Sequence, residues 1–387
     1  MSKEKPIFIS YIAKPLYKLF YLNPRVKVVL EDGGELNKIK GPALIVGNHS
    51  HSLDPIFIYS AMKPHVRWVA GAYLFKGKFL KFCLSNLATC IAKQQGRSDL
   101  TTIKSINSAL KEKSIVGLFP EGTRTWDGNS LEINHKATAK MFRIFKVPVY
   151  FLSFEGAYDL HPRWADVKRR GLLVVRLKKI LSVEEIEQSS VKELTEVVKN
   201  NLYFNHQEWQ EKTKRPFPCK KGAEGIQRLL YICPKCLNHQ VIKGDKNTVK
   251  CSHCGTEDTL TPYLNFEKSS FGFKTLPEWN DFQKEYITKH EINFDKDEGD
   301  FFRKGVGKKF EYISKKYTCQ LLNDKIVFTL SNGKILNFEI DKIESMVLSV
   351  KQSIEFYYEN QLFSFRLQSE LNSLKYFQKW ETNNVTV

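Results

Sequence analysis

The chain has 387 residues, of which 42% are hydrophobic and 13% aromatic, a length that exceeds the usual limit of one core and predicts two or three packed domains. The net charge of +18 favours polyanionic partners such as nucleic acid, phosphorylated substrates or an anionic membrane. No apolar run approaches the roughly 18 residues of a spanning helix, and no secretory signal is recognisable, so we expect a protein that is neither exported nor inserted across a bilayer.

Residues 6–21 place lysines on one side of a helical wheel and apolar side chains on the other. Pro15 would kink this stretch or divide it into two short helices. We predict an amphipathic helical segment over residues 1–24. It either lies in a membrane interface or packs on the domain that follows.

Short apolar runs between residues 27 and 180 alternate with helical patterns at 98–113 and 136–146. The runs that we interpret as strands are VKVVL, ALIVG, SIVGLFP, VPVYFLSF and LLVVRLK. Several are continuous enough to be buried on both faces of an α/β sheet. A charged amphipathic helix is expected at roughly 183–204, and the whole domain at 25–210.

A basic, proline-bearing stretch, KTKRPFPCKK, marks a domain boundary, and residues 211–262 are predicted to hold this connector and a small metal-binding module. Two Cys-x-x-Cys pairs stand fourteen residues apart, formed by Cys233, Cys236, Cys251 and Cys254. Four thiolates at this spacing are typical of structural Zn²⁺ in a zinc ribbon, and a closed set leaves no open position for catalysis. The alternative is four reduced thiols in an ordinary loop. Cys219 and His253 are candidate extra ligands, and Gly255 suits a tight turn after the second pair.

The last third, residues 263–387, is predicted to be a small β-rich (α+β) domain. A helix is expected at 276–290 and another at SELNSLKYFQKW, with six short strands between them: YTCQLL, KIVFTL, KILNFEI, SMVLSV, SIEFYY and LFSFRL. Asn332-Gly333 marks a hairpin turn. The element order alone resembles a pleckstrin-homology-like domain, which would imply a lipid or protein contact; the alternative is another small β-barrel or sandwich.

The stretch GNHSHSLDP, residues 47–55, holds two histidines and an aspartate within six residues. Dinuclear zinc hydrolases use His-x-His-x-Asp-His, but here the aspartate comes one residue too late and Pro55 follows it, which disfavours a metal. A polar loop is a second interpretation. In a third, His49 lies at the ligand-binding end of a strand, and Asp54 accepts one imidazole N–H and raises the basicity of the other nitrogen. Such a base can take a proton from an alcohol that attacks a carbonyl group.

A second motif, FPEGTRT at residues 119–125, also follows a strand. Gly122 permits a tight turn, and Arg124 supplies a planar fork suited to phosphate. Together NHSHSLD and FPEGTR resemble the NHx4D and FPEGTR boxes of the glycerolipid acyltransferase family, most closely the bacterial 1-acyl-sn-glycerol-3-phosphate (lysophosphatidic acid) acyltransferases. The resemblance covers about residues 25–205 and implies that family's mixed sheet flanked by helices.

The resemblance implies O-acylation: a fatty acyl group moves from acyl-CoA or acyl carrier protein to 1-acylglycerol-3-phosphate, which forms phosphatidic acid. His49 would be the general base and Asp54 would orient it, and no metal is needed. Other acceptors remain open, namely glycerol-3-phosphate, another lysophospholipid or an amino-acid lipid. A non-catalytic lipid- or nucleic-acid-binding scaffold is the alternative from a different class.

The resemblance also assigns substrate-binding positions: Asn48, Lys93, Glu121, Gly122, Thr123 and Arg124. Lys93 stands near the place of an arginine that the family carries between the two boxes, with Arg97 as a rival. Two further departures, Ser153 for a common proline and Ala137 for a common glycine, leave the acceptor's identity open.

The expected partners are an anionic membrane surface, a lysophospholipid acceptor and, as one of the two donors, acyl carrier protein. Seven basic residues and one aspartate in the stretch 161–180 would favour an anionic bilayer. Nucleic acid is not expected, because the ribbon lacks a basic surface interleaved with aromatic residues. These partners predict a cytoplasmic protein that is peripheral on the inner face of the membrane.

Overall fold

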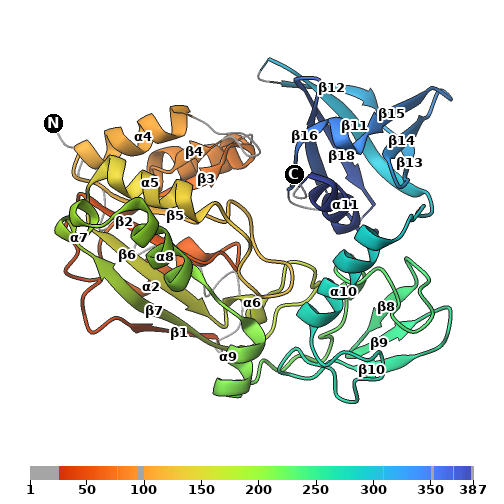
Figure 1. Cartoon of the computed structure of the whole chain (residues 1–387), viewed down its shortest axis with the longest axis horizontal. Coiled ribbons are helices and arrows are strands. Elements are labelled where there is room, and N and C mark those ends of the chain that lie inside the picture. The colour runs from red at the N-terminus through yellow and green to blue at the C-terminus, as the bar shows by residue number, and fades with distance from the viewer. Residues whose placement is uncertain are drawn as a thin grey trace. The chain divides into compact units, whose positions relative to one another are not determined.

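A computed structural model of the chain describes residues 26–75, 77–93, 100–307, 309–349, 353–368 and 370–384. The amphipathic segment predicted at residues 1–24 lies outside the described residues. The chain divides into two compact units (Figure 1), Met1–Arg163 with Lys168–Pro218, and Trp164–Val167 with Cys219–Val387. The finer domain boundaries stay predictions.

The first unit is built on a seven-stranded mixed sheet in its described residues. The strands are β1 (Val26–Glu31), β2 (Ala43–Gly47), β3 (Val66–Gly71), β4 (Ile91–Lys93), β5 (Ile115–Leu118), β6 (Val149–Glu155) and β7 (Gly171–Leu181). Their order is β1-β7-β6-β2-β5-β3-β4. Strands β6, β2, β5, β3 and β4 are mutually parallel, whereas β7 runs antiparallel to β6. The mixed sheet expected from the sequence is confirmed.

Helices cover both faces of this sheet, which explains why the β2 sequence ALIVG is apolar throughout and fully buried. Ala43 and Ile45 belong to one hydrophobic cluster, which includes Phe57 of α2 (Asp54–Ala61). Leu44 and Val46 belong to the other. The helices that contribute to this second cluster are α4 (Leu100–Lys111), α5 (His135–Phe145), α7 (Val183–Gln188) and α8 (Val191–Leu202).

The single helix expected at 183–204 is wrong in one respect, because the segment forms two helices, α7 and α8. Each begins with a capping box, in which a serine oxygen accepts the N–H of a glutamate three residues on and the glutamate bonds back. The serines are Ser182 and Ser190. The second box starts a new helix, so the charged pattern is interrupted. Helix α9 (His206–Thr213) follows.

Parallel strands end at one edge of a sheet, and here the segments after β2, β5 and β3 all leave from that edge. The first segment holds the GNHSHSLDP loop and the second the FPEGTRT loop. The third contains the short helices η1 (Ala72–Phe75), α3 (Lys78–Phe82) and η2 (Cys83–Leu87). Open α/β sheets bind ligands at this carboxyl edge.

The second unit begins with a small three-stranded antiparallel sheet in the order β10-β9-β8, which follows the short helix η3 (Ile226–Arg228). Its strands are β8 (Ile242–Asp245), β9 (Thr248–Cys251) and β10 (Glu257–Thr259). Helix α10 (Leu276–Lys289) comes next and begins with a Thr275–Glu278 capping box. This helix matches the one expected at 276–290.

The rest of the second unit is an antiparallel sheet with a final helix, α11 (Leu374–Asn384), which confirms the β-rich prediction. The strands and the connecting turn η4 are β11 (Asp297–Val306), β12 (Lys309–Ser314), β13 (Tyr317–Leu321), β14 (Lys325–Leu330), β15 (Ile335–Glu339), η4 (Ile340–Lys342), β16 (Ile343–Leu348), β17 (Ser353–Tyr358) and β18 (Gln361–Leu367). The hairpin at Asn332-Gly333 joins β14 and β15, with Gly333 at φ 82°. The pleckstrin-homology likeness stays a prediction.

A buried polar network joins three parts of the second unit. The Lys375 ammonium of α11 lies 2.7 Å from the carboxylate of Asp297 in β11, and both side chains are fully buried. The Tyr376 hydroxyl donates to the same carboxylate at 2.7 Å, and the Gln240 amide donates to it at 2.9 Å. The residues before β8 are thereby tied to the C-terminal sheet.

No helix among the described residues is both long enough and apolar enough to cross a membrane.

Candidate functional site

The GNHSHSLDP loop forms a histidine–carboxylate pair at the carboxyl end of β2. His49 Nδ1 lies 2.9 Å from Asp54 Oδ2. The same oxygen accepts the backbone N–H groups of Ser50 at 3.0 Å and His51 at 2.9 Å. Because Asp54 is the first residue of α2, its charge also meets the positive end of the helix dipole. The carboxylate therefore fixes both the loop and the imidazole.

Only one nitrogen of His49 remains for chemistry. With Nδ1–H donated to Asp54, the imidazole presents its Nε2 lone pair, which is the form that accepts a proton. The His49 side chain is 20% exposed, whereas Asp54 is fully buried. The ring stacks on Phe119 of the second motif, with centroids 4.3 Å apart and planes 8° from parallel. The imidazole is held by two contacts and is still partly exposed.

Asn48 and His51 hold the loop from inside the protein. Asn48 is 3% exposed, its carbonyl oxygen accepts from Phe154 N–H at 2.9 Å, and its amide donates to Ser50 Oγ at 3.1 Å. His51 is 1% exposed, and its Nδ1 accepts from Leu53 N–H at 2.9 Å. These contacts favour a structural role for both side chains, and the predicted part of Asn48 in substrate binding stays a prediction.

The FPEGTRT loop lies beside the first motif because β2 and β5 are neighbouring parallel strands, with Val46 opposite Leu118. Gly122 closes a tight turn by donating its N–H to Phe119 O at 3.0 Å, at a positive φ of 68° that suits glycine. Thr125 N–H donates to His49 O at 3.0 Å. The two loops, about seventy residues apart in the sequence, are thus in direct contact.

Glu121 couples the two loops through its carboxyl group. Its Oε1 accepts the backbone N–H of His49 at 3.0 Å, and its Oε2 is buried without a hydrogen-bond partner among the described residues. Burial raises the pKa of Glu121 to about 8, against the lowering effect of the hydrogen bonds from His49 and Leu131 N–H. Glu121 is therefore largely protonated at neutral pH and acts on the position of His49.

Arg163 joins this site and was not singled out by the sequence analysis. Its guanidinium donates to Thr123 Oγ1 at 2.8 Å and to Arg124 O at 3.3 Å, and lies 4.5 Å from the centre of the Trp126 ring. Burial and the nearby Arg124 charge lower its pKa to about 9. Two guanidiniums thus meet at one loop. In the sequence, Arg163 belongs to an HPRW segment within a basic stretch. No characteristic spacing links that segment to the two motifs.

The environment keeps His49 neutral. Burial lowers its pKa, Asp54 raises it, and the positive charges of Arg124 and Arg163 lower it again. A net lowering leaves the imidazole unprotonated at neutral pH, the form that a general base requires. The same effects show that both arginines lie within electrostatic reach of the imidazole.

A second histidine–carboxylate pair lies in the same unit but has a different setting. His206 Nε2 is 2.8 Å from Asp159 Oδ1, and the side chains are only 5% and 1% exposed. His206 N–H donates to the side chain of Asn129, and the Tyr158 hydroxyl donates to Trp126 O. These contacts hold the segment that follows FPEGTRT. Both side chains of the pair are almost completely buried, so a substrate cannot reach them.

Lys93 is the last residue of β4, opposite Gly71 at the end of β3. Strand β3 separates β4 from β5, so Lys93 lies roughly 10 Å across the sheet from the strand that carries the FPEGTRT loop. It shares the carboxyl edge with the site, and its predicted part in binding stays a prediction. Its rival Arg97 lies outside the described residues.

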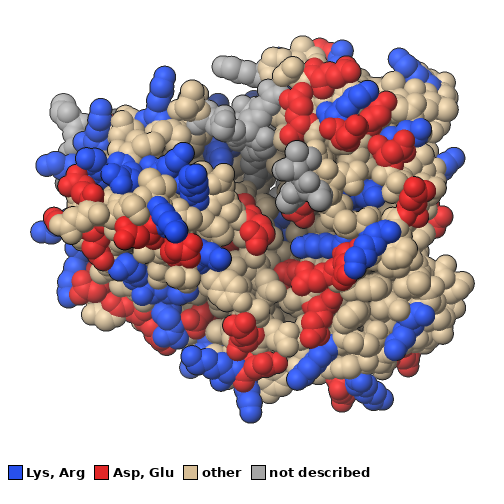
Figure 2. Space-filling model, viewed as in Figure 1, with Lys and Arg blue, Asp and Glu red and all other residues tan. Residues whose placement is uncertain are grey.

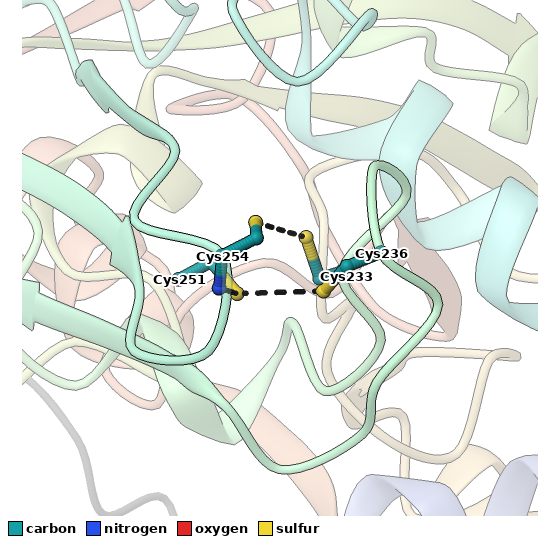
Figure 3. A group of neighbouring side chains, drawn as sticks. All are labelled: Cys233, Cys236, Cys251 and Cys254. Atoms are coloured by element: carbon teal, nitrogen blue, oxygen red, sulfur yellow. Dashed lines mark hydrogen bonds between the residues drawn. The ribbon is translucent and has the colours of Figure 1, made fainter.

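The four paired cysteines come together in the second unit, as Figure 3 shows. All four Sγ atoms lie within 4.8 Å of one another, and the separation is 3.8 Å for Cys233–Cys254 and for Cys236–Cys251. Zinc–sulfur bonds of about 2.3 Å in a tetrahedron put the sulfurs about 3.8 Å apart, whereas a disulfide requires about 2 Å. The cluster therefore has the dimensions of a metal site.

Two similar turns build this cluster. Leu237 N–H donates to Cys233 O at 2.8 Å, and Gly255 N–H donates to Cys251 O at 3.0 Å. Both residues have positive φ, 60° and 76°. Each Cys-x-x-Cys pair is thus closed by the residue that follows it, as expected for Gly255.

Part of the first unit matches a known family. Residues 27–154 match the family described as Acyltransferase, over a stretch that includes both motif loops. This match covers about a third of the chain and supports the resemblance seen in the sequence.

Two relatives share this region. The 1-acyl-sn-glycerol-3-phosphate acyltransferase of Saccharomyces cerevisiae is 26% identical over 180 residues, which are 46% of this chain and 58% of the yeast protein. The chain therefore matches less than two thirds of that relative. A solved structure, the 1-acyl-sn-glycerophosphate (LPA) acyltransferase PlsC from Thermotoga maritima, is 21% identical with a TM-score of 0.44, and the match covers 54% of this chain and 79% of that one.

Proposed function

We propose that the chain is an O-acyltransferase that moves a fatty acyl group from a thioester to the free hydroxyl of 1-acylglycerol-3-phosphate, forming phosphatidic acid. One observation carries the proposal: His49, oriented by the buried Asp54 at 2.9 Å and partly exposed, shares the carboxyl edge with the FPEGTRT loop. The acyltransferase match of residues 27–154 supports it.

In the proposed reaction His49 Nε2 removes the proton of the acceptor hydroxyl while its oxygen attacks the thioester carbonyl. Collapse of the tetrahedral intermediate breaks the carbon–sulfur bond, and the imidazolium returns the proton to the leaving thiolate. Asp54 stabilises the imidazolium through its bond to Nδ1–H. General-base catalysis of this kind is worth roughly 10²–10⁴ in rate.

The arginines support a phosphate-bearing acceptor. A phosphomonoester carries nearly two negative charges, and guanidinium forks bind such groups with charge-assisted hydrogen bonds. Arg163 reaches Thr123 and the Arg124 carbonyl within 3.3 Å, so both cations serve one loop. We assign this loop to the acceptor phosphate. Glycerol-3-phosphate, other lysophospholipids and amino-acid lipids are the alternative acceptors to be compared.

The donor is a thioester, either acyl-CoA or acyl carrier protein. Both donors present a thioester carbonyl and release a thiol, so the proposed base can serve either donor. Zn²⁺ is proposed for the four-cysteine cluster, because its dimensions fit a tetrahedral thiolate site. Such a closed site would stabilise the fold of the second unit and take no part in acyl transfer.

The test follows thiol release from acyl-CoA in the presence of lysophosphatidic acid. His49→Ala should reduce the rate by roughly 10²–10⁴, while His290→Ala, an exposed histidine of the second unit, serves as the matched control. Equal rates for wild type and His49→Ala would overturn the proposed base. Product mass spectrometry across the acceptors identifies the preferred one.

Absence of turnover with every acceptor and both donors would favour the scaffold alternative. Flotation on anionic vesicles beside gel shifts with DNA and RNA would then identify the partner.

A further inference from the structure

One segment of the first unit exposes large apolar side chains next to the site. In α3 and η2 the exposed fractions are 81% for Phe79, 43% for Leu80, 55% for Phe82 and 37% for Leu87. Neither η1, α3 nor η2 contains a buried residue among its described members. Scattered apolar residues at a surface are ordinary, but four within nine positions form a patch of the kind that marks an interaction site.

The same segment is cationic. Residues 72–87 contain three lysines and no aspartate or glutamate. Lys78 and Lys81 alternate with the exposed phenylalanines of α3. Lysine and phenylalanine interleaved on a short helix are the composition of an interfacial segment, in which the rings enter the acyl boundary and the ammonium groups meet anionic headgroups.

Neighbouring elements extend the positive charge. Strand β4 contacts both η1 and α4. Helices α4 and α5 carry five lysines and arginines and no acidic residue, and Figure 2 shows Lys and Arg side chains gathered over them. Basic residues close to an anionic bilayer are attracted to its headgroups. The charge complements a negatively charged surface.

The patch adjoins the catalytic edge. Segment η1–α3–η2 leaves β3 at the edge where the His49 and FPEGTRT loops leave β2 and β5. Tyr73 of η1 lies close enough to Arg163 to oppose the effects of burial and Arg124 on its pKa. A lipid held at this patch would therefore have its headgroup near the arginines.

We propose that Phe79, Leu80, Phe82 and Leu87, with Lys78 and Lys81, form a membrane-docking surface for an anionic bilayer, from which the lysolipid acceptor enters the site. The proposal rests on the proposed function for its acceptor. It commits to a bilayer because the patch pairs aromatic side chains with lysines and no acid. A second copy of this cationic surface would be repelled, and an acidic carrier protein would not need the exposed rings.

The first experiment is flotation of the full chain with vesicles of phosphatidylcholine alone or mixed with phosphatidylglycerol. Wild type should bind the mixed vesicles, and Phe79→Ser/Phe82→Ser should bind them roughly tenfold or more weakly. The matched control is Val306→Ser/Ile335→Ser, which removes two apolar side chains that are 44% and 58% exposed in the second unit. Equal binding of wild type and the phenylalanine variant would overturn the surface.

A charge variant keeps the test sharp if the phenylalanine variant misfolds. Lys78→Gln/Lys81→Gln should weaken binding to mixed vesicles by roughly fivefold per lysine and leave binding to pure phosphatidylcholine unchanged. Equal loss on both vesicles, or none on either, contradicts electrostatic docking. A shift to dimers by light scattering that these variants abolish would assign the patch to a second copy and overturn the bilayer proposal.

Activity measurements distinguish a failure of this docking surface from a failure of the proposed reaction. With short-chain lysophosphatidic acid dissolved as monomers, the Phe79→Ser/Phe82→Ser variant should release thiol at the wild-type rate. With the acceptor embedded in mixed vesicles, its rate should fall roughly tenfold or more. If no acceptor supports turnover but the variant still loses vesicle binding, the proposed reaction fails and the surface stands. A normal rate on embedded acceptor overturns the surface and leaves the reaction.

Discussion

Replacing Asp54 with asparagine tests whether the His49–Asp54 pair is a catalytic unit. The change keeps the size of the side chain and removes its charge. Asparagine's oxygen can still accept the backbone N–H groups of Ser50 and His51, so the loop should persist. The imidazolium that forms during catalysis would lose its carboxylate partner. We expect kcat to fall by roughly 10²–10⁴, the full worth of a positioned general base.

The structure also sets a stability cost for this variant. Asp54 is fully buried, and its Oδ1 has no hydrogen-bond partner among the described residues. An amide NH₂ at that place would be a buried unsatisfied donor, which costs about 1–3 kcal/mol. Thermal and urea unfolding should therefore show a moderate loss, and rates must be compared per folded molecule.

The pH profile separates loss of the relay from a simple protonation effect. Asp54 raises the pKa of His49, so the asparagine variant should have a lower His49 pKa and its acidic limb should move to lower pH. Raising the pH then cannot restore the rate. Asp159→Asn is the matched control, because it alters another buried carboxylate with an unpaired oxygen, away from His49. A folded Asp54→Asn enzyme with wild-type kcat would refute the reasoning.

Three further outcomes are expected. Burial raises the pKa of Glu121 from 4.5 to about 8. Between these pH values the folded state holds a proton that the unfolded state has lost, so stability falls as the pH rises. Glu121→Gln should remove this pH dependence, which melting temperatures measured across the same pH range would show. Arg163→Met should raise the pKa of His49, moving the acidic limb of kcat/KM to higher pH, and should raise KM for lysophosphatidic acid roughly tenfold or more; an unmoved limb contradicts the placement of this charge. Metal analysis should find about one zinc per chain, lost in Cys233→Ser and retained in Cys219→Ser, a cysteine outside the cluster.

Strands of the first unit were predictable where a continuous apolar run meant burial on both faces, as in β2 and β6. Strands β3 and β4 were not predicted, because VRWVAG and IAK are the last two strands on one side of the sheet and are only partly buried. In the second unit β11 and β12 carry charge at many positions, DEGDFFRKGV and KFEYIS, and gave no clean alternation. The final helix begins five residues later than its pattern, where the Asn372 side chain accepts Lys375 N–H.

Within the site, the motif residues were predictable because their spacing is local, but the roles of some depended on contacts across the fold. The sequence assigned Glu121 to substrate binding, which stays a prediction, and did not reveal that its oxygen also accepts the backbone N–H of His49. Arg163 is supplied by a segment 39 residues beyond Arg124, and nothing in its neighbouring sequence distinguishes it from the other arginines of the basic stretch. Such residues are identified only from a three-dimensional structure, because their contacts join segments that are distant in the sequence.

The arrangement also explains why the two motifs lie 70 residues apart and still act together. Residues from β2 and β5 pair in parallel register, so Gly47 and Phe119 begin their loops side by side. The stack of Phe119 on His49 and the bonds to Glu121 and Thr125 then lock one loop to the other. Because both loops are fixed to the same pair of strands, a change in either should alter the position of the base, and Gly122→Ala, strained at φ 68°, should reduce kcat through His49 without touching the imidazole.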